Sequence, residues 1–112
     1  MRPVPQLLLG GFLAGVASFA WAQPAVDVAA AEALSKKSGC MKCHSVSAKK
    51  EGPPFKETAA KYKGKADGAQ KLYIHLTTNP KVKVDDKEEL HDALKTKNEA
   101  EIKNMIQYIL TR

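Results

Sequence analysis

The two cysteines of this 112-residue chain lie three positions apart, and a histidine follows the second one directly. Cys40-Met41-Lys42-Cys43-His44 therefore brings two thiols and an imidazole together in one short segment. A chain of this length buries a limited core, and domains so small usually need a disulfide, a metal or a cofactor to be stable. The group that stabilises this small domain is therefore expected at this segment.

Several chemistries use two neighbouring cysteines. A thioredoxin-type motif needs a βαβ setting, whereas this motif follows an expected helix in a chain with little strand signal. A zinc site would need a second pair of ligands, and the chain has no further cysteine. A plain disulfide is sterically awkward at this spacing and leaves His44 unexplained. We therefore predict one covalent haem c, with thioethers at Cys40 and Cys43 and with His44 as an axial ligand of the iron.

The N-terminal segment has the pattern of an export signal. Arg2 precedes an apolar run over residues 7–20, and Ala20-Trp21-Ala22 is a small-x-small cleavage site. A membrane anchor is the alternative, but the run is short, contains glycines and lacks a basic cluster after it. We predict a secretory signal peptide over 1–22, cleaved after Ala22, and one domain over 23–112.

The domain over 23–112 is basic. Without Arg2 it has 17 Lys+Arg against 12 Asp+Glu, a net charge of +5. This balance favours acidic protein partners, and it also fits weak association with an anionic membrane surface. Nucleic acid is disfavoured as a partner because the chain is exported and lacks the interleaved aromatic and arginine residues that stack on bases.

The first half of this domain predicts two helices. One runs over 28–37, with Asp27 as its cap and Gly39 at its end. After a polar loop, Pro54 suits the first position of a second, short helix. Phe55, Ala59 and Tyr62 recur on one face of that helix.

The second half predicts two more helices and a loop between them. Asp67 is expected to cap a helix that runs to about Thr77, and Asn79-Pro80 stops it. Asn98 caps the last helix, as part of an N-x-x-E capping box with Glu101. The apolar stripe of the last helix is Ile102, Met105, Ile106, Ile109 and Leu110. Residues 81–96 lack sustained periodicity, so we predict a long loop with at most one helical turn, of the kind that is often functional.

Together these features resemble the small bacterial class I cytochromes c. Residues 36–44 are similar to that family's haem segment, and residues 107–110 are similar to its terminal helix. The resemblance implies an all-α fold of about four short helices around one haem, in a periplasmic protein that we expect to be a monomer. It also implies that the Pro53 carbonyl accepts the ring N–H of His44. Phe55 and Tyr62 would pack around the porphyrin, although ordinary core packing explains both equally well.

The sequence departs from this family at the second axial ligand. Members usually carry a methionine in the loop before the last helix, and this loop has none. It has His91, 17 residues before Tyr108, close to the place of the family's sulfur ligand. We predict His91 as the second ligand. The alternatives are His75, for which a surface or propionate-side location is more natural, Met105, which suits core packing, and a vacant position.

The expected chemistry is electron transfer. Methionine ligation raises a haem's reduction potential, so two histidine ligands should lower it. No nucleophile–base pair or phosphate-binding loop is recognisable, so we predict a single-electron carrier and not an enzyme. Two alternatives stay open: a haem-based gas sensor with a labile sixth ligand, and the electron-entry subunit of a larger oxidoreductase.

Overall fold

The computed structural model describes residue 15 and residues 25–112. The elements in this part are α1 (Val28–Ser38), the 3-10 turn η1 (Cys40–Lys42), α2 (Phe55–Tyr62), α3 (Gly68–Thr77), β1 (Lys81–Val84), β2 (Lys87–Leu90) and α4 (Glu99–Leu110). The signal peptide expected over 1–22, apart from Gly15, and its cleavage site lie outside the described residues. Among the described residues, none of the helices has the length and hydropathy needed to cross a bilayer.

Helix α1 has the two ends that the sequence predicts. The Asp27 carboxylate accepts the N–H of Ala30 at 3.0 Å, which satisfies a free donor of the first turn. Gly39 ends the helix with φ of 75°, a left-handed conformation that glycine adopts without steric cost. The last turn carries Lys36 and Lys37, whose charges suit the negative end of the helix dipole.

The starts of α2 and α3 differ from the sequence-based expectation. Pro54 is the capping residue of α2 and Phe55 its first helical residue, one position later than predicted. Asp67 precedes α3, but its side chain makes no capping hydrogen bond. Its φ of −102° and ψ of 3° are not the extended backbone of a capping residue. Its carboxylate pairs instead with Lys71 Nζ at 3.1 Å.

The prediction of a long loop over 81–96 was wrong in its first part. Strands β1 and β2 form an antiparallel hairpin, in which Val84 pairs with Lys87. Asp85 and Asp86 form the turn with φ of 48° and 64°, as a two-residue type I′ hairpin requires. Val82 and Val84 give β1 a short apolar alternation, but it is too short to predict a strand, and β2 is exposed and charged throughout, so the second strand has no such pattern. Residues 91–98 have neither helix nor strand.

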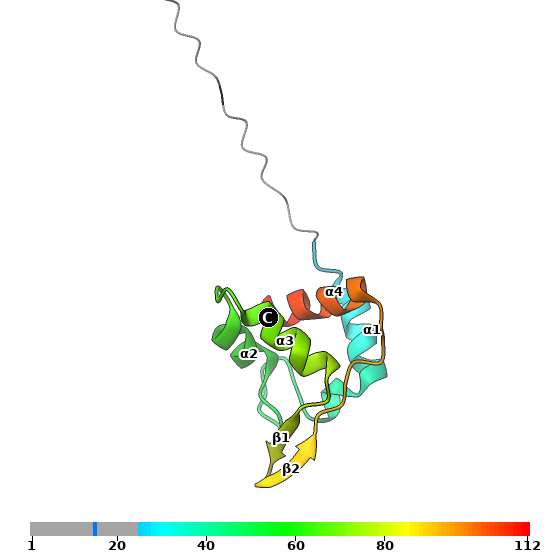
Figure 1. Ribbon diagram of the computed structural model, residues 1–112, viewed down its shortest axis with the longest axis vertical. Coiled ribbons are helices and arrows are strands. Elements are labelled where there is room, and N and C mark those ends of the chain that lie inside the picture. The colour runs from blue at the N-terminus through cyan, green and yellow to red at the C-terminus, as the bar shows by residue number, and fades with distance from the viewer. Residues whose placement is uncertain (1–14, 16–24) are drawn as a thin grey trace, which may run out of the picture.

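Helix α4 crosses α1 and is also packed by α2 and α3 (Figure 1). Its cap is the predicted one: Asn98 Oδ1 accepts the N–H groups of Ala100 and Glu101 at 2.9 and 3.2 Å. The carboxylate of Glu101 accepts the hydroxyl of Thr96, so the capping box is not closed.

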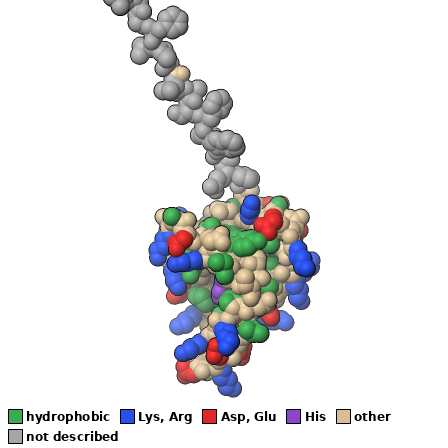
Figure 2. All heavy atoms as spheres, in the orientation of Figure 1, with side chains coloured by type: hydrophobic (Ala, Val, Ile, Leu, Met, Phe, Trp, Pro, Cys, Tyr) green, Lys and Arg blue, Asp and Glu red, His purple; other side chains and the backbone are tan. Residues whose placement is uncertain are grey.

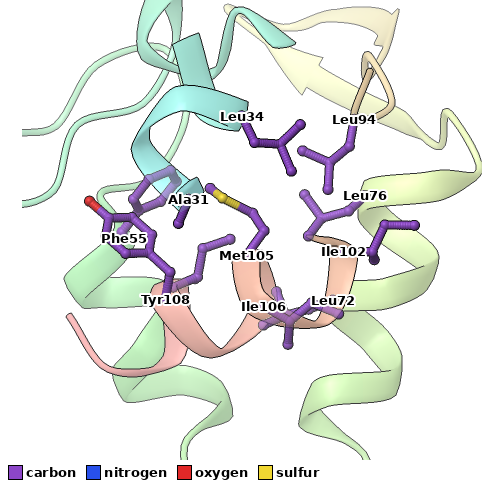
Figure 3. Packing of buried hydrophobic residues seen from close by; sticks show 11 residues of the cluster. Ala31, Leu34, Phe55, Leu72, Leu76, Leu94, Ile102, Met105, Ile106 and Tyr108 are labelled. Carbon is purple, nitrogen blue, oxygen red and sulfur yellow. The ribbon is translucent and has the colours of Figure 1, made fainter. Parts of the chain in front are cut away.

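The core forms where these helices meet, with the α4 stripe at its centre (Figure 3). Its buried members are Ala31, Leu34, Phe55, Leu72, Leu76, Leu94, Ile102, Met105, Ile106, Tyr108 and Ile109. Met105 is fully buried. The helices thus form one packed body, from which the hairpin projects (Figure 1).

Candidate haem-binding site

The C-x-x-C-H segment directly follows α1. After the left-handed turn at Gly39, η1 starts at Cys40 and ends before Cys43. The N–H groups of Cys43 and His44 both donate to Cys40 O, at 3.2 and 2.9 Å, and close the turn. Both cysteines are free thiols and half-buried, so the turn presents two sulfurs and one imidazole.

The surroundings of both thiols favour the protonated form. Burial raises the pKa of the Cys40 thiol. The Cys43 Sγ donates to Glu51 Oε2 at 3.4 Å, and this negative neighbour raises the pKa of the Cys43 thiol. Both surroundings thus favour the thiol over the thiolate, which is the reactive form.

The ring of His44 is held on three sides. Its Nδ1 lies 2.7 Å from Pro53 O. Because a carbonyl only accepts, Nδ1 carries the proton and the Nε2 lone pair is left for a metal. Phe55 stacks on the ring with centroids 5.5 Å apart, and Gly52 lies so close that a Cβ there would stand 2.5 Å from Cε1. The hydrogen bond expected between His44 and Pro53 is therefore present.

The structure brings His91 to the same site. Its N–H donates to Pro80 O at 2.8 Å, and its carbonyl accepts Asn79 Nδ2 at 3.0 Å. These bonds tie the backbone after β2 to two of the residues that connect α3 to β1. The His91 ring centroid lies 6.1 Å from that of His44, with an angle of 56° between the ring planes. Burial, and then the charge of His44, lower the pKa of His91.

His75 is also part of this cluster. The sequence favoured a surface or propionate-side location for it, and its half-buried ring lies against His91 with centroids 4.1 Å apart. The segment after β2 folds back on α3 and covers this edge of the helix, so the ring does not lie free on the surface. Burial lowers the pKa of His75 to about 4, with a further contribution from His91.

The other candidates are placed in or beside the core. Phe55 is buried, and its ring meets Tyr108 edge-on with centroids 6.2 Å apart. Tyr62 is half-buried against the core, and Lys61 Nζ lies 5.2 Å from its ring centroid. Met105 packs within the hydrophobic cluster, as expected of a methionine used as core filler (Figure 3).

Sequence reasoning did not recognise why Gly52 has to be a glycine. The carbonyl of Pro53 was expected to bond His44, but nothing in a Gly-Pro pair indicates that a ring touches the glycine Cα. The Gly52 N–H donates to Cys43 O at 2.7 Å, which pulls the loop onto the haem-binding turn. A β-carbon has no space there.

Comparison with known proteins agrees with this geometry. The model of the cytochrome c family matches residues 28–112. This chain belongs to the cytochrome c family. It is 42% identical to cytochrome c-551 of Stutzerimonas stutzeri over 73 residues, which are 65% of this chain and 62% of the relative. It is 35% identical to cytochrome c-551 of Pseudomonas aeruginosa over 72 residues, 64% of each chain. This cytochrome c thus spans less than two thirds of the length of either relative.

Solved structures extend the likeness to the fold. The Class 1 cytochrome MtoD of Sideroxydans lithotrophicus ES-1 is 44% identical, with a TM-score of 0.73 over 78% of this chain and 97% of that one. Wild-type cytochrome c552 of Nitrosomonas europaea is 30% identical, with a TM-score of 0.55 over 71% of this chain and 96% of that one. The expected class I cytochrome c fold is confirmed, with the hairpin as a small β addition.

Membership of the family and the Cys40/Cys43 pair together identify the cofactor as covalent haem c. The described residues fit this group: two unpaired thiols flank a turn that ends in an imidazole with a free Nε2. The buried Nδ1 of His91, which has no hydrogen-bond partner among the described residues, shows a second imidazole without the usual polar contact. The roles of Pro53, Phe55, Tyr62 and His91 toward the haem stay predictions.

Proposed function

We propose that this cytochrome c is a periplasmic single-electron carrier whose iron is bound by His44 and His91. The distance of 6.1 Å between their ring centroids carries the proposal. Two imidazoles on opposite sides of one metal have centroids about 6 Å apart, for metal–nitrogen bonds of about 2.0–2.1 Å. The chain already holds the two rings at that separation, so ligation needs no large movement of either backbone.

The surroundings of His44 suit electron transfer. When bound, haem c supplies a ferric/ferrous couple that takes up and releases one electron. Pro53, Gly52 and Phe55 fix the His44 ring by a hydrogen bond and by packing. A ring that cannot rotate keeps the same ligand geometry in both oxidation states, and its hydrogen bond to Pro53 makes it the more basic ligand.

A second histidine ligand would change the reduction potential of the haem. Methionine as an axial ligand raises the reduction potential of a haem, so a histidine in that place lowers it, other factors being equal. Met105 is fully buried in the core, which supports its exclusion as a ligand. This cytochrome c would therefore act in a lower-potential branch of electron transfer than relatives with a methionine ligand.

Charge supports acidic redox proteins as partners. The chain carries 18 Lys+Arg against 12 Asp+Glu. In the view of Figure 2, lysine and arginine side chains lie around the edge of the domain, and hydrophobic side chains gather nearer its middle. Such a surface attracts an acidic partner at long range in encounters that salt weakens. The export signal expected over 1–22 supports the periplasmic location.

Replacement of His91 tests the ligation. In haem-loaded His91→Ala, we expect the ferric protein to lose its six-coordinate low-spin spectrum, because the sixth position loses its imidazole. Asp92→Ala is the matched control, since Asp92 is the exposed neighbour and its loss should leave the spectrum unchanged. An unchanged low-spin spectrum in His91→Ala would assign the sixth position to another residue.

Carbon monoxide tests the carrier against a gas sensor. Reduced wild-type protein should resist carbon monoxide, because both axial positions are filled, whereas reduced His91→Ala should bind it stoichiometrically. Rapid stoichiometric binding by the wild type would overturn the carrier and favour a sensor with a labile ligand.

A further inference from the structure

The two histidines of the site are oriented by different means. The His44 ring is fixed by its hydrogen bond to Pro53 O. The Nδ1 of His91 is buried, yet it has no hydrogen-bond partner among the described residues. Metal-bound histidines almost always donate their second ring N–H to a carbonyl, a carboxylate or water, which sets the ring orientation. Because no hydrogen bond of ordinary geometry from the described part of the chain holds Nδ1, packing against neighbouring side chains has to contribute to the orientation of the His91 ring.

The neighbour in the right place is His75. The two ring centroids are 4.1 Å apart and the planes are tilted by 48°, which is direct packing of one ring on the other. This contact is shorter than the 6.1 Å between His91 and His44. His75 is half-buried, so its ring is confined by α3 on one side and by the segment after β2 on the other.

The backbone makes this contact rigid. The segment after β2 is tied to α3 by Leu94 N–H to Leu76 O at 2.9 Å, and to the residues that follow α3 by His91 N–H to Pro80 O at 2.8 Å. A third bond joins Asn79 Nδ2 to His91 O at 3.0 Å. These bonds fix the position of the His91 Cα relative to α3, so the freedom that remains is rotation of its side chain, and the His75 ring limits that rotation.

We propose that His75 is a positioning residue that sets the ring plane of His91 at the iron. The inference rests on the proposed ligation by His91. The planes of His44 and His91 are tilted by 56°. The angle between two axial imidazoles determines the splitting of the iron d orbitals, which the electron paramagnetic resonance spectrum of the ferric low-spin state reports directly.

The test compares His75→Ala and His75→Phe in haem-loaded protein. We expect His75→Ala to stay low-spin but to shift the low-field g value and broaden it, because the His91 ring gains rotational freedom. His75→Phe restores a flat ring and should keep the g value of the wild type. Ile74→Ala is the matched control on the same helix, since Ile74 is 47% exposed, and it should change nothing. If His75→Ala does not fold, His75→Leu replaces it as an apolar side chain without a ring.

Each other outcome overturns the inference. An unchanged g value in His75→Ala, or in His75→Leu where that variant replaces it, would show that His75 does not orient His91; these two are the ringless variants. A shift in His75→Phe equal to that of the ringless variant would show that ring packing is not the cause. The spectrum of His91→Ala, recorded alongside, separates the proposed ligation by His91 from the proposed positioning role of His75.

If His91→Ala stays low-spin, His91 is not the ligand and the inference about His75 falls with it. If it becomes high-spin while the ringless variant keeps the wild-type g value, only the positioning role fails. A high-spin ringless variant beside a low-spin His91→Ala would make His75 itself the ligand.

Discussion

Gly52 lies against the imidazole of His44, so that a β-carbon at position 52 would stand 2.5 Å from Cε1 and 2.8 Å from Nδ1. On its other sides the ring is bonded to Pro53 O and stacked on Phe55. The histidine of the haem motif is thus clamped largely by a backbone that approaches more closely than any side chain would allow.

Gly52→Ala should destabilise the protein and disturb the haem. The added methyl group meets a ring that cannot move aside, and overpacking of this kind costs about 1–3 kcal/mol of unfolding free energy. Denaturant unfolding and the optical spectrum of the haem check both effects. Ser47→Ala, at an exposed position between the haem-binding turn and Gly52, should have neither effect. Wild-type stability in Gly52→Ala would mean that the loop yields at little cost.

Asn104→Ala should weaken the junction between α1 and α4. Asn104 Oδ1 accepts the Asp27 N–H at 2.9 Å, and Asn104 Nδ2 donates to Asp27 O at 2.8 Å. Loss of both bonds at this partly exposed place should cost about 1–2 kcal/mol. The urea midpoint should fall with an unchanged slope. Lys103→Ala, at the exposed neighbour, should leave the midpoint in place, and an equal fall in both variants would contradict a specific role of the two bonds.

Stability should decline at alkaline pH through Tyr73. Its hydroxyl donates to Glu99 Oε1 at 2.6 Å, and the carboxylate raises the pKa of Tyr73 above its ordinary value of 10.0. The folded state therefore favours the protonated phenol. This contribution is fully present below the unfolded pKa of about 10 and is lost as the pH rises through the folded pKa.

The free energy of unfolding, measured at pH values below and above the Tyr73 pKa, tests this contribution. Tyr73→Phe should be less stable than the wild type below pH 10, and the gap should close above the folded pKa. Glu99→Gln removes the charge, so the Tyr73 pKa should move back toward its ordinary value. A constant gap at all pH values would show that the hydrogen bond does not couple to the titration.

Met105 should behave as a core residue. Met105→Leu nearly conserves volume and should cost less than about 1.5 kcal/mol, whereas Met105→Ala should cost about 2–5 kcal/mol. Both variants should keep the low-spin haem spectrum of the wild type. A high-spin spectrum in Met105→Leu would instead identify its sulfur as an axial ligand.

Helix caps could be predicted from the sequence where a few neighbouring residues form them. Asp27 and Asn98 cap their helices as expected, because a capping side chain bonds backbone groups two or three residues away. Asp67 has the same residue type and failed as a cap, because its backbone is not extended. The hairpin was missed because Asp85-Asp86 lacks the glycine that usually marks such a turn, although both residues are left-handed.

The haem cofactor, the cysteine pair that binds it and the positions of the four helices could all be inferred from the amino-acid sequence, whereas His44 as the first axial ligand stays a prediction. These follow from groups within one turn of each other, so spacing alone specifies them. The chain fold alone sets that His91 lies beside His44, that His75 lies against His91, and that Gly52 touches the His44 ring. Residues 44, 75 and 91 are distant along the chain, and their distances are set by the packing of the helices and by the hydrogen bonds that tie the segment after β2 to α3.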